Sequence, residues 1–123
     1  MKLSMNQTIY YLLSRIEEQG YKAYLVGGAV RDAILNQPNN DYDICTNMPL
    51  YLIKELYPNF HFMKPNAHRN TGIVKLDGLE VEISEFKGNN ILEDLHNRDF
   101  TINAMALDKD GNLTDPYNGL QAL

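Results

Sequence analysis

The chain has 123 residues, 11 basic against 16 acidic side chains, and a formal net charge of −5 at pH 7. This length suits one domain with a modest core, and 44% hydrophobic with 22% charged residues excludes wholesale disorder and fibrous architecture. No apolar run approaches the ~20 residues that cross a bilayer, so we predict a cytoplasmic protein without a membrane partner. A single cysteine, Cys45, excludes an internal disulfide. The acidic balance argues against long nucleic acid held mainly through phosphate contacts.

The first half of the chain is predicted to alternate helices and strands. In residues 8–19, hydrophobic side chains recur at helical spacing between a candidate cap, Asn6, and a stop, Gly20. The elements expected next, in chain order, are a strand over 21–26, a helix over 29–35, a strand over 41–45 and a helix over 49–56.

The second half is predicted to contain two hairpins separated by a short helix. Asp77-Gly78 lies between two apolar stretches and is the strongest short-range signal for a two-residue hairpin turn. The expected elements are strands over 71–76 and 79–86, a helix over 91–97, and a hairpin that pairs 103–107 with 113–115. No internal repeat or linker interrupts the chain, so the elements predict one α+β domain.

Asp41 and Asp43 are the most informative pair of side chains. Two residues apart on a strand, they project to the same side, roughly 6 to 7 Å apart, while Tyr42 and Ile44 take the other, apolar face. Like charges so placed repel unless a cation offsets them, and Mg²⁺ typically takes one or two carboxylates plus substrate phosphates. The pair is therefore a candidate metal site. By itself, such a pair more often lies on a solvated strand edge.

A glycine turn precedes this strand. Gly27 and Gly28 join the predicted strand to the predicted helix, and Arg31 follows one turn later. Glycine permits close ligand approach, and a helix start with an arginine supplies N–H donors for phosphate. The alternative is a tight turn in which Arg31 pairs with Asp32 or with a surface acid.

Four segments occur in a recognisable order: LVGGAVRD at 25–32, DYDI at 41–44, LHNRDFTINAMA at 95–106 and DPYNGL at 115–120. Together they resemble the head domain of CCA-adding tRNA nucleotidyltransferases and bacterial poly(A) polymerases, the class II branch of the polymerase-beta-like nucleotidyltransferases. The resemblance implies a mixed sheet flanked by helices, two Mg²⁺ ions, and transfer of a nucleoside monophosphate from an NTP such as ATP or CTP to a 3′-hydroxyl, with release of pyrophosphate.

The same resemblance implies roles for individual residues. Asp41 and Asp43 match the metal carboxylates, and Glu82 aligns with a third carboxylate for which Glu80 and Glu85 compete. The remaining matches are Gly27, Gly28 and Arg31 in the triphosphate-binding turn, Arg98 near phosphate with Asp99 beside it, and Asn103 near the ribose.

Two departures qualify the match. Asn97 stands where the family usually has the first arginine of its RRD segment. Residues 1–123 match the head alone, so the neck, which reads the base in the family, and the body and tail, which hold tRNA, are expected to be absent. An RNA 3′ end, tRNA first, is the expected acceptor, with further domains or a partner subunit needed to hold it.

Two other function classes remain open. A short acidic domain would also suit a stand-alone nucleotidyltransferase that modifies a protein or small-molecule hydroxyl. A non-enzymatic nucleotide-binding remnant is the third class, and the retained like charges argue against it.

Overall fold

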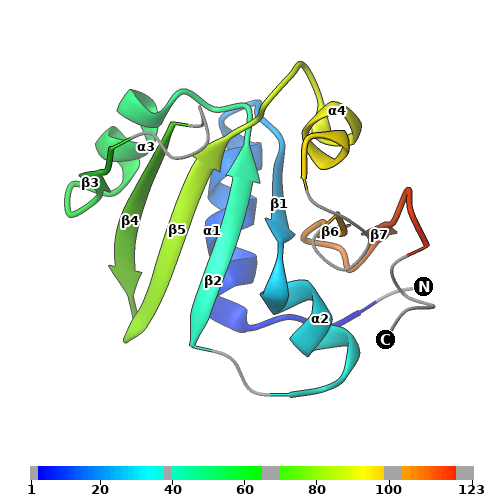
Figure 1. Ribbon diagram of the computed structural model, residues 1–123. Coiled ribbons are helices and arrows are strands. Elements are labelled where there is room, and N and C mark those ends of the chain that lie inside the picture. Colours follow the sequence, from blue (N-terminus) through cyan, green and yellow to red (C-terminus); the bar gives the residue numbers. More distant parts are fainter. Residues whose placement is uncertain (1–2, 38–39, 65–69, 99–103, 119–123) are drawn as a thin grey trace.

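The computed structural model describes residues 3–37, 40–64, 70–98 and 104–118, and a mixed sheet forms the centre of this part of the chain (Figure 1). Its strands are β1 (Ala23–Val26), β2 (Asp41–Thr46), β3 (His61–Phe62), β4 (Thr71–Leu76), β5 (Leu79–Glu85), β6 (Ala106–Leu107) and β7 (Leu113–Thr114). They lie in the order β3-β4-β5-β2-β1-β6-β7. β2 and β5 run parallel, and the other neighbours in this order run antiparallel.

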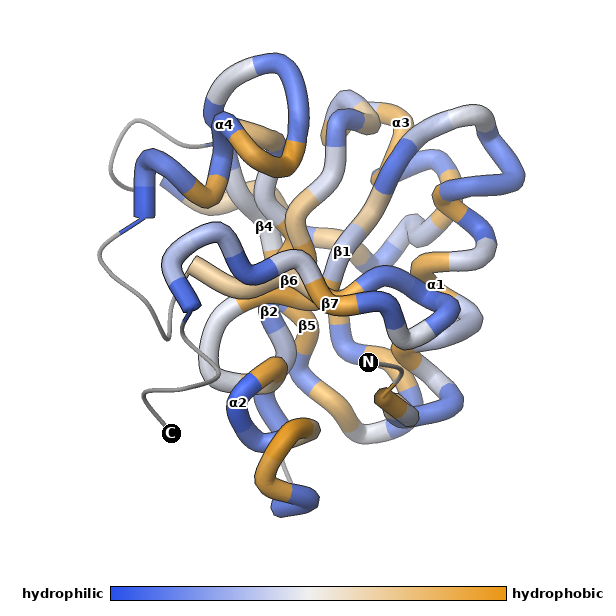
Figure 2. Tube along the Cα trace, turned by 90° about the vertical axis from the view of Figure 1, so that its right-hand side faces the viewer, coloured by the Kyte–Doolittle hydropathy of each residue, from blue (hydrophilic) through white to orange (hydrophobic). Residues whose placement is uncertain are grey.

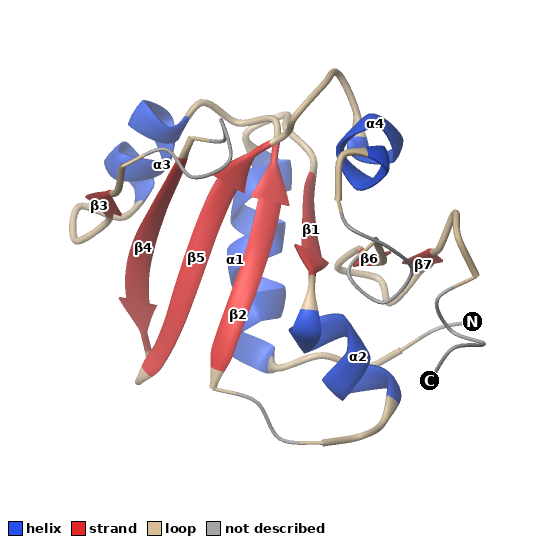
Figure 3. Cartoon of the chain, in the orientation of Figure 1, coloured by secondary structure: helices blue, strands red, loops and turns tan. Residues whose placement is uncertain are grey.

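Helices flank the sheet (Figure 3). They are α1 (Gln7–Glu18), α2 (Gly28–Ile34), α3 (Leu50–Leu56) and α4 (Ile91–His96). α1 lies behind the sheet in Figures 1 and 3. The buried hydrophobic residues of α1, α2 and α3 join one hydrophobic cluster, whereas those of α4 join another. The predicted α+β architecture is therefore confirmed.

Local sequence signals explain where several elements begin and turn. The Asn6 side chain caps α1 by accepting hydrogen bonds from the backbone N–H groups of Thr8 at 2.8 Å and Ile9 at 3.4 Å. Asp77 and Gly78 have φ values of 50° and 79°, the left-handed conformations that a two-residue hairpin turn needs. Both predictions are confirmed by the structure.

The alternation of β2 divides its side chains between the two faces. Ile44 packs with α1 in the larger cluster, whereas Cys45 packs with Val26, Ile91 and Leu95 in the smaller one. Figure 2 shows hydrophobic strand segments in the interior and hydrophilic loops outside. Asp41 and Asp43 therefore share the α4 side of the sheet with Cys45, away from the main core.

Several predicted boundaries shift. β1 begins at Ala23 rather than residue 21, because Lys22 is held by side chains: its N–H donates to Asn47 Oδ1 at 2.7 Å and its carbonyl accepts from Thr46 Oγ1 at 2.6 Å. The short strand β3 was not predicted; both of its residues are exposed, so no alternation marks it. In the parts of the chain that the structure describes, no helix is long and apolar enough to span a bilayer.

Candidate active site

The parallel pair β2–β5 brings four carboxylates onto one face. Asp41 lies opposite Glu80, and Asp43 lies opposite Glu82, on backbones about 4.8 Å apart. Together with Ile73 of β4, these side chains line a pocket on the sheet. Figure 1 presents this face to the viewer, since α1 covers the back. Residues some 40 positions apart in the sequence therefore meet at one site.

The three glutamates that compete as the third carboxylate differ in their surroundings. Glu82 accepts a hydrogen bond from the protonated form of the Asp43 carboxyl, and its Oε1 accepts from Thr71 Oγ1 at 3.4 Å. Glu85 follows the opposite alternation and accepts from the Leu50 N–H at the start of α3, at 3.3 Å. Glu80 pairs with Asp41 in the register. The geometry favours Glu82 as the partner of Asp43.

The electrostatics of the pocket centre on Asp43. Loss of hydration is the largest cause that raises the pKa of this carboxyl, and the hydrogen bond and negative charge of Glu82 raise it further, to about 6. Although the residue stays accessible to solvent, the surrounding protein removes part of its hydration. Arg98 acts in the opposite direction. The site therefore concentrates negative charge and has a deficit of positive charge.

This donor set fits a divalent cation that completes its coordination with oxygens from a ligand. Among the residues that the structure describes, no group of three His, Cys, Asp or Glu side chains is arranged to hold a metal ion. Mg²⁺ is commonly bound through one or two carboxylates together with substrate phosphates and water. Asp41 and Asp43 are the residues suited to hold such an ion, with phosphate oxygens supplying the rest.

The excess of negative charge around Asp43 makes the stability of the fold depend on pH. The folded-state pKa of Asp43 is raised from 3.8 to about 6, so the native state binds more protons than the unfolded state between these values, and stability falls as pH rises through this window. After allowance for solvent exposure, we expect Asp43→Asn to be more stable than the parent by about 1 kcal/mol at pH 7.5 and equal to it near pH 3.5. Urea unfolding in EDTA measures this, with Glu55→Gln as a control at an exposed acid. A difference that is independent of pH would contradict the assignment.

The glycine turn lies directly against the Asp43 carboxylate. Gly27 has φ 72° and ψ −148°, a conformation that is essentially restricted to glycine. A Cβ atom at this position would lie 3.1 Å from Asp43 Oδ2. The turn and the carboxylate pair, which are separate motifs in the sequence, therefore form one site.

Arg31 lies over the same turn. Its Nε is 3.3 Å from Asp32 Oδ1, and its side chain is 44% exposed. A Cβ at Gly28 would lie 3.2 Å from Arg31 Nη2, so the guanidinium lies against Gly28. The pairing of Arg31 with Asp32, one of the two alternatives, is thus present. An exposed pair of this kind contributes at most about 1 kcal/mol, which leaves Arg31 able to turn toward an anion.

Arg98 approaches the site from the end of α4. Its Nε donates to Asp94 Oδ2 at 2.9 Å. Burial lowers the pKa of this guanidinium, but Asp94 and the Cys45 thiol raise it by more, so that Arg98 stays charged. Asp94 is fully buried and was not predicted from the sequence, although an acid four residues before an arginine on a helix is a recognisable ion-pair spacing. Asp99 and Asn103 lie outside the described residues.

The fold and this site define a class of protein. Residues 23–92 and 80–123 match the family described as Poly A polymerase head domain, and the chain belongs to this family, as the resemblance of its motifs indicates.

Relatives and solved structures agree with that membership. The CC-adding tRNA nucleotidyltransferase of Halalkalibacterium halodurans is 40% identical over 108 residues, covering 88% of this chain and 28% of the relative. The CCA-adding enzyme of a Geobacillus species is 32% identical, with 91% and 31% covered. The Bacillus stearothermophilus CCA-adding enzyme in complex with CTP superposes with a TM-score of 0.82 and 33% identity over 94% of this chain and 31% of that one. The chain thus spans about three tenths of the length of these proteins.

Proposed function

We propose that the chain is the catalytic head of a nucleotidyltransferase that moves a nucleoside monophosphate from ATP or CTP to the 3′-hydroxyl of an RNA, tRNA first. The observation that carries the proposal is the placement of Asp43 between Glu82 and the Gly27 turn. A similar structure supports nucleotide transfer to tRNA. It is a tRNA nucleotidyltransferase complexed with a primer tRNA and an incoming ATP analog, at TM-score 0.71 and 32% identity over 88% of this chain.

In this proposal Asp41 and Asp43 would hold two Mg²⁺ ions, with Glu82 as the third carboxylate. When bound, such ions activate the attacking hydroxyl and neutralise the charge of the leaving pyrophosphate. The carboxylates would offset the positive charge of the ions, and by holding the ions they would keep the reacting groups in line. Little side-chain acid–base chemistry is required, because phosphoryl-type transfer depends mainly on positioning and on charge stabilisation.

The phosphate chain would lie along the glycine turn. Gly27 and Gly28 carry no side chain that would block the approach of phosphate to the backbone, and Arg31 places a positive charge beside Gly28. Arg98 would contribute a second positive charge near the phosphates. The family resemblance assigns Asp99 to the same nucleotide site and Asn103 to the ribose. The arginines would stabilise the charge that develops on the pyrophosphate.

In this proposal, binding of the tRNA requires protein segments in addition to these residues. Since the chain covers about three tenths of its relatives, we propose that further domains or a partner subunit hold the tRNA, and that the work is done in the cytoplasm.

The direct test is incubation with Mg²⁺, each labelled NTP in turn, and tRNA that lacks its 3′ CCA end. Label in the RNA supports the proposal, with Asp43→Asn as the inactive control. Label transferred to protein or to a small hydroxyl compound instead would identify a nucleotidyltransferase of another kind. Nucleotide binding without transfer to any acceptor, even with the relatives' remaining domains added, would identify a binding remnant.

The 123-residue chain is expected to discriminate poorly among the four NTPs. Its candidate contacts are to phosphate, metal and ribose, and none of them reads a base edge. Dissociation constants measured by calorimetry should therefore agree within about tenfold, or ~1.4 kcal/mol. A strong preference for CTP and ATP over UTP and GTP would show that these residues themselves read the base.

A further inference from the structure

Asp94 is a buried charge that accepts hydrogen bonds from two different described segments of the chain. It is fully buried, and a carboxylate is almost never buried to this extent unless it is paired. Its Oδ1 accepts from the backbone N–H of Lys87 at 2.8 Å, and its Oδ2 accepts from Arg98 Nε at 2.9 Å. One carboxylate oxygen thus binds the backbone of the segment that follows β5, and the other binds the Arg98 side chain.

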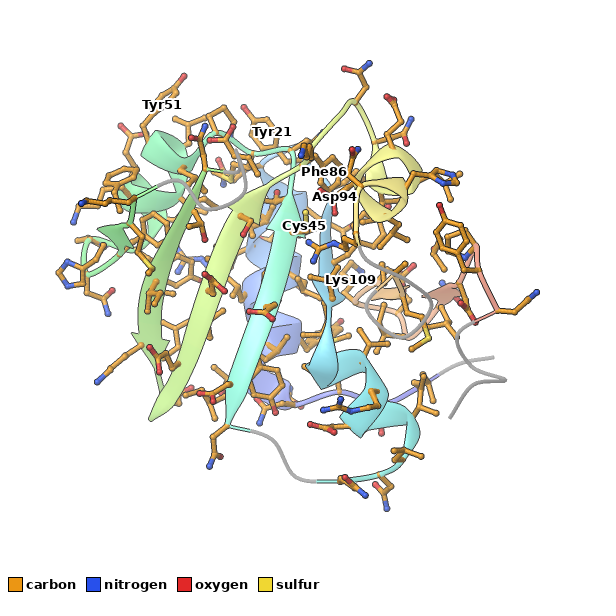
Figure 4. The ribbon with its side chains drawn as sticks, in the orientation of Figure 1. Tyr21, Cys45, Tyr51, Phe86, Asp94 and Lys109 are labelled. Atoms are coloured by element: carbon orange, nitrogen blue, oxygen red, sulfur yellow. The ribbon has the colours of Figure 1, made fainter. Side chains whose placement is uncertain are left out.

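The hydrogen bond from Arg98 to Asp94 determines which N–H groups of the guanidinium remain to bind a ligand. Asp94 engages Nε, and the Cys45 sulfur accepts a further hydrogen bond from the guanidinium. The terminal amino groups of Arg98 therefore keep N–H donors for other partners. The Cys45 thiol of β2 lies beside the guanidinium, and Figure 4 shows Cys45 and Asp94 near the same end of the sheet, next to α4. The Arg98 side chain is only 19% exposed, yet its positive charge lowers the pKa of the Asp43 carboxyl. The guanidinium is therefore held at the border between the buried cluster and the carboxylate pocket.

We propose that Asp94 is a positioning residue, which holds Arg98 so that its terminal amino groups face the phosphates of the incoming nucleotide. This inference rests on the proposed function. Without Asp94, Arg98 could turn toward the Asp43–Glu82 pair, since its charge already acts on the Asp43 carboxyl. An arginine bound there would compete with the cation and point away from the phosphates.

A purely structural role for Asp94 predicts something different. If Asp94 served only to hold the Lys87 backbone, any acceptor of the same shape would do. An asparagine in its place would keep an oxygen for the Lys87 N–H and would lose the charge that faces Arg98. The substitution Asp94→Asn therefore separates the two interactions.

The test compares four proteins: the parent, Asp94→Asn, Arg98→Gln and the double variant. Each is titrated with an NTP and with the matching nucleoside in Mg²⁺, after circular dichroism has shown that it is folded. We expect Asp94→Asn to weaken NTP binding about tenfold, as is usual when a group that orients a ligand-binding side chain is lost, and nucleoside binding less than about twofold. The double variant should bind NTP no more weakly than Arg98→Gln alone, because both substitutions act through one group. Glu93→Gln, on the same helix, is the matched control and should change neither affinity.

The outcomes distinguish this inference from the function on which it rests. If Arg98→Gln weakens NTP binding and Asp94→Asn does not, or if Asp94→Asn weakens NTP and nucleoside equally, the positioning role is wrong and the proposed function stands. If Arg98→Gln has no effect, the phosphate role of Arg98 is itself wrong.

A measurement on the parent protein covers the case in which Asp94→Asn does not fold. The Arg98 Hε resonance should be protected from solvent exchange and remain so in the NTP complex, while the terminal amino groups shift. Loss of protection at Hε when the nucleotide binds would overturn the proposal.

Discussion

Replacing Asp43 by asparagine is expected to abolish nucleotidyl transfer, with a loss of about a thousandfold or more, equivalent to ~4 kcal/mol of transition-state stabilisation. The amide keeps the shape of the side chain but would not balance the charge of a metal ion held by the aspartates. Asp41→Asn should have a comparable effect. Single-turnover transfer to tRNA without its 3′ CCA measures the loss, and unfolding experiments verify that each variant remains folded.

The paired substitutions Glu82→Gln and Glu80→Gln identify the third carboxylate. Both glutamates lie on the pocket face of β5, so the two changes are matched in charge and strand. A large loss with Glu82→Gln and a small one with Glu80→Gln is the expected pattern. Near-normal transfer by Asp43→Asn would refute the carboxylate site altogether.

Gly27→Ala is expected to abolish nucleotide binding and to destabilise the fold. Its φ of 72° with ψ −148° costs an alanine about 1–3 kcal/mol. The added Cβ would also lie 3.1 Å from Asp43 Oδ2, so that the carboxylate would have to shift by a few tenths of an ångström. Calorimetric titration with MgATP and urea unfolding measure the two effects.

Gly20→Ala provides the control for backbone strain. Gly20 has φ 91° but no atom within 4 Å of an added Cβ, so the change should lower stability without reaching the site. If Gly27→Ala keeps full nucleotide affinity, or if Gly20→Ala loses it as well, the turn is not part of the binding site.

Local signals in the sequence were sufficient for much of the fold. The alternation of residues 41–44 places Asp41 and Asp43 opposite the core-facing Ile44, because successive side chains of a strand point to opposite faces. Asn6 and Asp77-Gly78 act on backbone groups within a few residues of themselves, and such short-range geometry follows from the local sequence. The family motifs also predicted the Asp41–Asp43 and Gly27–Gly28 segments as parts of one site.

Only the tertiary structure decided how distant segments meet. Residue spacing alone does not select between Glu80, Glu82 and Glu85; that choice depends on β5 lying parallel to β2 in the register that sets Glu82 beside Asp43. Asp94 looks like an ordinary polar helix residue until the packing of α4 buries it against Arg98. Strand pairing and burial arise from contacts between residues far apart in the chain, so the charge environment of the candidate site emerges only when the sheet and α4 are assembled.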